Sequence, residues 1–355
     1  MKKTSKILIL LLIFSMILSL AACQKKEAPD DGEIQEETAK EEENTDLEGT
    51  TLNIVATSES YKEFFDKFTN ETGIKVEFIS MSSGELLSRV RAEEGKPMAD
   101  VWFGGGLDAF MQAKEEGLLE SYISKESEDI PAEFKDPEGY WIGKGLTIVG
   151  LLVNKDILEE NNLPMPTSWK DLTNPVYKDE IIMSNPAISG TNYAAVNGLL
   201  QMMGEEGWKF FEELDKNIPY YAKRGKDPQL KTMEGEFAIG IIPADKSAFD
   251  LQEEQNVEVV FPEDGIPWVP EGVAIFKNSQ NLEGAKAFID FMLSKENQQI
   301  LAQIDGKDGA QMVKPGVEGY NLGVPEERFI KQDLSSFGKD RESILERWSE
   351  LVGDK

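Results

Sequence analysis

The sequence lacks histidine altogether, and its 355 residues include a single cysteine. Without histidine, the chain cannot form a histidine-based catalytic triad, use a histidine general base or bind a metal through imidazole. With one cysteine, it can form neither an intrachain disulfide nor a metal site built on two thiolates. These two absences exclude several common hydrolase and metal-site chemistries.

Basic residues are scarce as well, with 37 Lys and Arg against 66 Asp and Glu and a formal net charge of −29. Nucleic acids and anionic membranes both bind surfaces rich in Lys and Arg. We therefore expect no nucleic-acid partner. The length suits two ordinary domains or one large one, and 40% apolar residues are enough for a sizeable core.

Long hydrophobic runs are missing too. The longest apolar run near the start, Ile7 to Leu20, is shorter than the ~20 residues that span a bilayer. Three lysines precede this run, and the small residues Ala21 and Ala22 follow it. A basic start, a short apolar run and small residues at the cleavage site are typical of a secretory signal. We predict that residues 1–22 are a signal peptide.

The single cysteine, Cys23, directly follows this segment. The letters "LAAC" resemble a bacterial lipobox, which implies cleavage before Cys23 and lipidation of its thiol; the alternative is an ordinary signal peptide with a chance cysteine. A diacylglycerol group carries two acyl chains, which suffice for stable anchoring. Residues 24–50 hold 11 acidic and 3 basic residues and no aromatic. We predict that residues 23–50 are a lipidated cysteine and a disordered acidic tether to the outer face of a membrane.

The remaining chain alternates strand and helix patterns. Strand signals at 51–57, 73–80 and 99–105 are each followed by a helical spacing of apolar residues. This rhythm is typical of a parallel sheet with helices on both faces. A long apolar strand, Gly145 to Asp156, leads to a second block of strands and helices. We predict an α/β fold of two lobes, each an open sheet, joined by crossover strands. Lobe 1 would hold residues 51–148 and about 266–300, and lobe 2 residues 149–265 and about 301–355.

Small and hydroxyl-bearing residues follow several of these strands. Open α/β sheets bind ligands beyond the carboxyl ends of their strands. Backbone N–H groups at helix starts, together with Ser and Thr hydroxyls, can hold an anion, and glycines let it approach the backbone. The alternative is that these residues are ordinary helix caps and turns; their number favours binding. The candidates are Ser58, Ser82, Ser83, Gly104, Gly105, Ser189, Gly190 and Thr191.

Three further residues are weaker candidates. Arg224 could grip a phosphate or carboxylate, or it could belong to a solvated basic loop. Asp245 could pair with a ligand amine or hydroxyl, or it could cap the following helix. Trp268 lies among proline and glycine residues and could face a ligand. A pair of carboxylates could also serve a glycosidase, but no spacing selects two of them.

Several stretches resemble the solute-binding lipoproteins of ABC importers. They include "MSSGELLSRVRAEEGKPMADVWFGGGLDAFMQAKEEGLLE", "NPVYKDEIIMSNPAISGTNYAAV" and "EGVAIFKNSQNLEGAKAFIDFMLSKENQQ". The nearest group has the type 2 periplasmic-binding fold and is called ferric-iron-binding-like; it also includes hexose-phosphate and aminoethylphosphonate binders. The resemblance covers Thr51 to Trp348. It implies two lobes that close on a ligand, and a permease pair and an ATPase as partners. It also implies an anion cradle, formed by Ser58, Ser83, Gly105, Ser189, Gly190 and Thr191.

The chain departs from the group at one place. Ferric binders have paired tyrosines just after the "GE-x-A-x-G" strand, where this chain reads "IIPADKSAF", and Tyr220 and Tyr221 lie before that strand. Hexose-phosphate binders tend to have a His-Asp pair there, of which this chain keeps Asp245. A phosphorylated or phosphonylated organic solute therefore fits the resemblance best.

Our hypothesis is a monomeric receptor, without a cofactor, that grips a small anionic solute between its lobes and closes about the crossover strands. No bond would be made or broken. Three alternatives stay open: a ferric-iron receptor of an iron importer, a surface hydrolase such as an esterase or glycosidase, and a lipoprotein sensor or adhesin without transport. The lack of histidine counts against an esterase.

Overall fold

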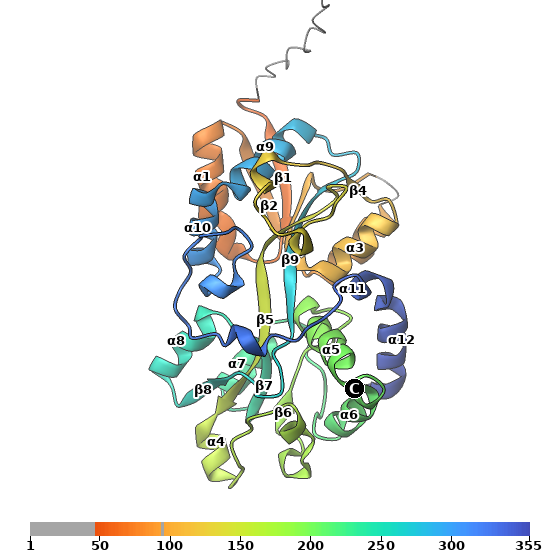
Figure 1. Ribbon diagram of the computed structural model, residues 1–355, viewed down its shortest axis with the longest axis vertical. Coiled ribbons are helices and arrows are strands. Elements are labelled where there is room, and N and C mark those ends of the chain that lie inside the picture. Colours follow the sequence, from red (N-terminus) through yellow and green to blue (C-terminus); the bar gives the residue numbers. More distant parts are fainter. Residues whose placement is uncertain (1–46, 94–95) are drawn as a thin grey trace, which may run out of the picture. The chain divides into compact units, whose positions relative to one another are not determined.

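The computed structural model describes residues 47–93 and 96–355 (Figure 1). The predicted signal peptide, the lipidation of Cys23 and nearly all of the predicted tether lie outside the described residues. Within the described part, the strands follow the order β2-β1-β3-β9-β5-β7-β6, with β4 beside β9 and β8 beside β5. The strands are β1 (Thr51–Ala56), β2 (Lys75–Ser80), β3 (Val101–Gly106), β4 (Leu119–Glu120), β5 (Ile142–Asn154), β6 (Ile181–Ile182), β7 (Ile239–Pro243), β8 (Val257–Val260) and β9 (Trp268–Phe276).

Helices follow most of these strands, as the alternating pattern predicts. None of the helices within the described residues is both long enough and apolar enough to cross a membrane. The α-helices are α1 (Lys62–Thr72), α2 (Ser83–Ala92), α3 (Leu107–Glu115), α4 (Lys155–Glu160), α5 (Gly190–Met203), α6 (Glu206–Asp215), α7 (Asp227–Met233), α8 (Lys246–Glu254), α9 (Leu282–Leu293), α10 (Lys295–Ile304), α11 (Ser336–Lys339) and α12 (Arg341–Val352).

The first lobe is built on β1, which lies parallel to both β2 and β3. Successive side chains of these strands face opposite sides of the sheet. Ile54 and Phe103 accordingly pack under α1 and α9, whereas Val55 and Trp102 pack under α2 and α3. Helix α1 ends at Gly73, whose φ of +74° suits a residue without a side chain. Both faces of the sheet are therefore covered, as the sequence predicts.

The second lobe is built around the second half of β5, which pairs antiparallel with β7 on one side and β8 on the other. Its core contains the aromatic side chains of Trp169, Tyr177, Phe211 and Trp348. The ring of Trp348, from α12, lies 5.4 Å from that of Phe211, from α6. The C-terminal helix thus helps to close this core.

Two long strands run between the lobes. The first half of β5 pairs with β9, and β9 in turn pairs with β3 of the first lobe. Figure 1 shows β5 and β9 side by side where the upper and lower halves of the described body meet. The chain after α10 makes another connection, because α11 packs near α3 and α12 joins the second core. Leu301 and Val313 pack in the first core. The residue boundaries of the lobes stay a prediction.

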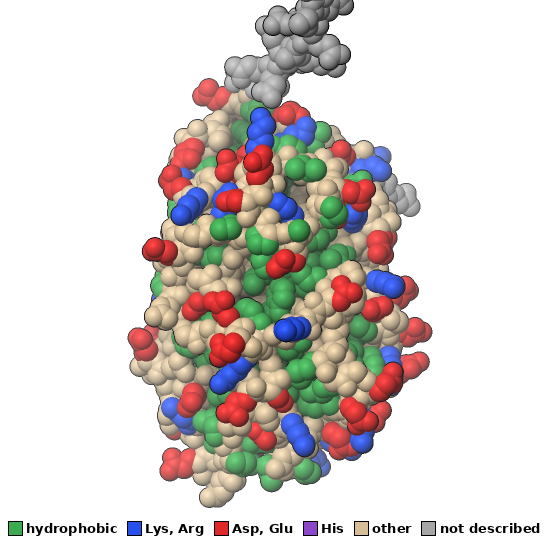
Figure 2. All heavy atoms as spheres, in the orientation of Figure 1, with side chains coloured by type: hydrophobic (Ala, Val, Ile, Leu, Met, Phe, Trp, Pro, Cys, Tyr) green, Lys and Arg blue, Asp and Glu red, His purple; other side chains and the backbone are tan. Residues whose placement is uncertain are grey.

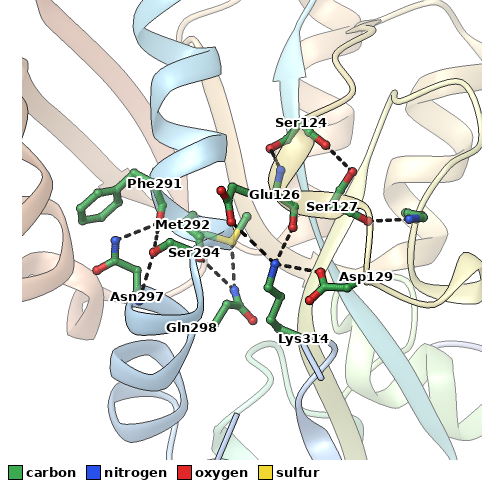
Figure 3. Close-up of polar contacts among 11 residues, drawn as sticks. Ser124, Glu126, Ser127, Asp129, Phe291, Met292, Ser294, Asn297, Gln298 and Lys314 are labelled. Atoms are coloured by element: carbon green, nitrogen blue, oxygen red, sulfur yellow. Dashed lines mark hydrogen bonds and ion pairs between the residues drawn. The ribbon is translucent and has the colours of Figure 1, made fainter. Parts of the chain in front are cut away.

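The buried lysine Lys314 holds in place the segment between β4 and β5. Its ammonium donates to the backbone oxygen of Glu126 at 2.6 Å and lies 2.8 Å from the carboxylate of Asp129 (Figure 3). The neighbouring junction of α9 and α10 is held by side-chain amides, since Asn297 donates to the carbonyl of Phe291 at 2.9 Å. We call Lys314, Glu126 and Asp129 the Lys314 cluster.

Charged side chains of both signs are mixed on the one face of the molecule that Figure 2 shows. On the face drawn in Figure 2, acidic and basic groups lie scattered among neutral ones rather than gathered by sign.

Candidate functional site: a cleft between the two lobes

A cleft of about 710 Å³ lies between the lobes, and segments of both line it. The sequence-predicted residues converge here, because nine of the eleven predicted ligand-binding residues line this cleft. Their role in binding stays a prediction. The nine are Ser58, Ser82, Ser83, Gly105, Ser189, Gly190, Thr191, Arg224 and Asp245.

The wall from the first lobe is rich in hydroxyl groups. Ser58 caps the short helix that follows β1, because its side chain accepts from the backbone N–H of Ser60 at 3.2 Å. Ser82 stands at the N-cap of α2 but makes no capping bond, and its buried Oγ has no partner among the described residues. A buried hydroxyl without a partner is costly, so Ser82 is suited to bond something that enters the cleft.

The wall from the second lobe is formed by the start of α5. Ser189 is the N-cap of this helix, and its hydroxyl accepts from the backbone N–H of Asn192 at 3.3 Å. Gly190 and Thr191 follow as the first helical residues, whose N–H groups have no acceptor within the helix. Ser189 is therefore a cap, and the helix start beside it still offers donors to the cleft. Asp245 is likewise a cap, because it accepts from Ser247 N–H at 3.0 Å at the start of α8.

Glycines bring the two walls into backbone contact. A Cβ on Gly190 would lie 2.9 Å from the nitrogen of Gly106 and 3.2 Å from Oγ of Ser83. A Cβ on Gly84, in α2, would lie 2.5 Å from the carbonyl oxygen of Ala187. The starts of α2 and α5 thus meet across the cleft. Each helix start carries partial positive charge, so an anion in the cleft beside both of them is favoured.

Three cationic side chains lie near the place where the starts of α2 and α5 meet. Lys223, Arg224 and Lys226 line the cleft from the turn before α7, and their exposed side chains form no ion pair or hydrogen bond within residues 47–93 and 96–355. The turn lies close to the α5 cap, since a Cβ on Gly225 would be 3.4 Å from Ser189 Oγ. Ser184 Oγ donates to the backbone oxygen of Arg224 at 2.6 Å and holds the turn in place. These charges would attract an anion to the two helix starts. We call the helix-start residues Ser82, Ser83, Gly190 and Thr191, together with these three cations, the cradle.

The base of the cleft has a different chemistry, which the sequence did not reveal. Glu271 of β9, together with Asp305 and Lys307 after α10, lines it. The Glu271 carboxylate lies 2.6 Å from Lys144 Nζ and 2.7 Å from Lys307 Nζ, and it accepts from the Thr147 hydroxyl. Lys144 Nζ also donates to Asp305. We call Glu271, Asp305, Lys307 and the buried Lys144 behind them the floor.

The four charged groups of the floor depend on one another. Burial would lower the pKa of Lys144, but the carboxylates of Asp305 and Glu271 outweigh it and raise that pKa well above its usual value. Burial would raise the pKa of Glu271, yet Lys144 and Lys307 hold it well below its usual value. The hydroxyl of Tyr61, buried beside them, has its pKa raised by burial and then by Asp305. Lys144 and Glu271 are therefore both charged at neutral pH.

Two irregularities in the sheet direct these side chains. The β5–β9 pairing shifts register between Gly143 and Gly145, which places Lys144 at a bulge. The β3–β9 pairing shifts between Phe103 and Gly106, where Gly104 and Gly105 have φ values of +87° and +103°. Bulges re-aim side chains and are common beside functional sites.

The two remaining predicted residues do not line the cleft. Trp268 donates from its indole nitrogen to the carbonyl of Ile330 at 2.9 Å, and its ring packs near Phe134 and Phe329. Gly104 lies behind Thr57, because a Cβ there would be 2.6 Å from the Thr57 hydroxyl oxygen. Sequence reasoning missed the floor. Glu271 could have been found, because a glutamate inside an otherwise apolar strand is unusual. Asp305 and Lys307 follow a helix, where charged residues are ordinary, so the sequence gives no reason to select them.

Comparisons with known proteins agree with this geometry. A family model described as bacterial extracellular solute-binding protein matches residues 96–332. An uncharacterized protein of Haemophilus influenzae is 31% identical over 317 residues, covering 85% of this chain and 88% of that one. A probable ABC transporter periplasmic-binding protein of Sinorhizobium fredii is 30% identical over 257 residues, 68% of each chain. The solved periplasmic binding protein AfuA of Actinobacillus pleuropneumoniae, with fructose 6-phosphate bound, is 30% identical with a TM-score of 0.81, covering 86% of this chain and all of that one.

The chain therefore belongs to the family of bacterial extracellular solute-binding proteins. It is the solute-binding component of an ABC importer, a class that binds small solutes outside the cytoplasm and works with permease and ATPase subunits. The predicted two-lobed fold of the type 2 periplasmic-binding kind is confirmed.

Proposed function

We propose that this protein captures a phosphorylated or phosphonylated organic anion for import. One observation carries the proposal: the starts of α2 and α5 meet in one cleft beside the hydroxyl of Ser82 and three cations, none of which has a side-chain partner among the described residues. This set supplies many donors at one place, which matches the several acceptor oxygens of a phosphoryl or phosphonyl group.

Each lobe supplies some of the hydrogen-bond donors, and this division explains how the protein captures the solute. Ser82 and Ser83 belong to the first lobe, and Gly190, Thr191 and Arg224 to the second. An anion that bonds both sets holds the lobes together, so binding favours the closed arrangement over an open one. The protein's task is binding and release at the permease, and we expect no catalysis.

The solved relative AfuA supports this choice of solute, because its structure contains fructose 6-phosphate. The geometry gives less support to a ferric-iron receptor. The Tyr221 hydroxyl donates to Asp215 at 2.9 Å, the Tyr220 ring packs on Phe237, and neither residue lines the cleft. The described residues also contain no group of three or more Asp, Glu or Cys residues placed to hold a metal ion.

Membrane attachment is part of the same proposal. We infer that the chain is cleaved before Cys23, lipidated on that thiol and held as a monomer at the outer face of the membrane. In bacteria supplied with radiolabelled palmitate, the wild-type protein should incorporate the label, and Cys23→Ser should not. Equal labelling of the two proteins, or no labelling of the wild type, would contradict this anchor.

A thermal-shift screen tests the proposed solute class. Binding at 100 times Kd adds about 2.7 kcal/mol of stability, which should raise Tm by roughly 4 °C for a folded body of about 300 residues. We expect such a shift with phosphate esters or phosphonates. A shift with Fe³⁺ and none with any of these compounds would overturn the proposal.

A single substitution locates the binding. Ser82→Ala removes a hydroxyl that has no partner in the described part of the chain, so it should leave Tm without ligand unchanged and weaken anion binding about tenfold. Ser88→Ala is the matched control, because Ser88 lies in the same helix and its exposed hydroxyl donates to Gly84 O instead. Equal affinity of the Ser82→Ala and Ser88→Ala proteins would argue against the cradle.

A further inference from the structure

The cradle and the floor present different chemistry to one cavity. The cradle offers donors and unpaired positive charge. The floor contains two lysines and two carboxylates, so its formal charge is balanced. A solute that fills both regions must therefore carry its anionic group at one end and an uncharged polar group at the other.

Two groups on the floor keep unused hydrogen-bonding capacity. Lys307 Nζ has three N–H donors, and the one partner recorded for it within the described residues is Glu271. Asp305 uses one carboxylate oxygen for Lys144, and its other oxygen has no partner in that part of the chain. Both side chains are buried and line the cleft. The floor thus offers one strong donor beside one strong acceptor.

A hydroxyl group suits this pair better than an amine does. It can donate to Asp305 and accept from Lys307, and neighbouring hydroxyls can share the two roles. A ligand ammonium could donate to Asp305, but it would meet the like charge of Lys307 and could accept nothing from it. The balanced charge of the floor leaves no surplus carboxylate to compensate an added cation.

The floor and the cradle are close enough for one small solute. A Cβ on Gly104 would lie 3.5 Å from Lys144 Cε, and a Cβ on Gly106 would lie 3.1 Å from the Cα of Gly190. The two glycines are two residues apart, which spans at most about 7 Å of extended chain. Residues of both regions also line the same cleft of about 710 Å³, so one small solute can reach both.

We propose that the floor binds hydroxyl groups on the organic part of the solute, with Asp305 accepting hydrogen bonds from them and Lys307 donating hydrogen bonds to them. The solute class is then a polyhydroxylated phosphate ester, such as a sugar phosphate, and not an aminoalkyl phosphonate. This inference rests on the proposed function, because the cradle must hold the phosphate. Lys144 is a positioning residue, which holds Glu271 and Asp305 from behind without reaching the solute.

Isothermal titration of the purified protein tests the proposal. The probes are glucose 6-phosphate, ribose 5-phosphate, glycerol 3-phosphate, 2-aminoethylphosphonate and inorganic phosphate. We expect at least one hydroxylated ester to bind tenfold or more tightly than 2-aminoethylphosphonate and inorganic phosphate. Asp305→Asn should weaken that ester about 10- to 100-fold and change the affinity for inorganic phosphate less than twofold.

Asp129→Asn is the matched control. It makes the same change beside another buried lysine, Lys314, away from the cleft, and should alter neither affinity. Circular dichroism confirms that each variant is folded, and Lys307→Met, which should show the same selective loss, replaces Asp305→Asn if that protein does not fold.

Failure of the floor proposal and failure of the proposed function would give different results. Tightest binding of 2-aminoethylphosphonate, or an equal loss for the ester and inorganic phosphate in Asp305→Asn, would overturn the role of the floor and leave the proposed anion receptor in place. A protein that binds none of the five probes would overturn the proposed function as well.

Discussion

Lys144 and Lys314 are two buried lysines that each lie near two carboxylates, yet their surroundings differ. Lys144 is 0% exposed, and its partners Glu271 and Asp305 have side chains that are 12% and 7% exposed. Lys314 is 8% exposed, but Glu126 and Asp129 are 49% and 53% exposed (Figure 3). The carboxylates of the Lys314 cluster are thus about half exposed, whereas those of the floor are nearly buried.

This difference decides what each ion pair contributes. When a partner is lost, a hydrated carboxylate returns to water at little cost, but a buried one is left as an uncompensated charge. The floor is therefore a coupled unit on which both stability and the shape of the cleft depend. A change there lowers stability and also weakens binding of the organic part of the solute, so the binding role needs a measurement that compares one ligand with another.

The largest expected effect comes from Lys144→Met. The substitution leaves Asp305 buried without its cation, and Glu271 keeps only Lys307, so we expect a loss of about 3–5 kcal/mol in the free energy of unfolding. Urea unfolding followed by circular dichroism measures it. A loss below about 1 kcal/mol would show that the floor behaves like the Lys314 cluster.

Combining Lys144→Met with Asp305→Asn sharpens this test. Asp305→Asn removes the negative charge that Lys144→Met leaves without a cation. The loss in the free energy of unfolding of the double variant should therefore be about 1–3 kcal/mol smaller than the sum of the two single losses. Lys314→Met with Asp129→Asn should give a coupling near zero. Simple additivity at both sites would mean that burial does not distinguish them.

The stability of the protein at acid pH should show the same difference between the floor and the Lys314 cluster, because Glu271 of the floor titrates there. Its pKa in the folded protein is lowered, so it contributes stability that is fully present above its usual pKa of 4.5 and is lost as pH falls below that value. The slope for one such group approaches about 1.4 kcal/mol per pH unit. Stability curves between pH 5 and 3 should be shallower for Lys144→Met than for wild type, and unchanged in slope for Lys314→Met. Parallel curves for all three proteins would contradict the account.

The smallest effect is expected at the Lys314 cluster. Lys314→Met should cost about 1 kcal/mol, because the lost contacts are one bond to the carbonyl of Glu126 and ion pairs with hydrated carboxylates. Asp129→Asn should stay within about 0.5 kcal/mol of wild type. Chemical denaturation of both variants beside Lys144→Met measures these differences, and a cost for Lys314→Met equal to that of Lys144→Met would remove the contrast.

The sequence predicted much of the cradle because strand ends are visible as breaks in apolar patterns. Ser82, Ser189 and Thr191 each follow such a break, and the sheet places them at one edge. The floor was beyond this reasoning. Lys144 reaches it through a bulge, and Asp305 and Lys307 come from a loop whose position depends on how α10 packs, so no local pattern connects them.

The most direct test of the central claim is a crystal structure of the protein with the hydroxylated phosphate ester that binds most tightly. We expect the phosphate to lie within hydrogen-bond distance of Ser82 Oγ and the backbone N–H of Thr191, with hydroxyl groups of the solute directed to Asp305 and Lys307. A phosphate bound at Lys307, with the cradle filled by the organic part or by a metal ion, would contradict it.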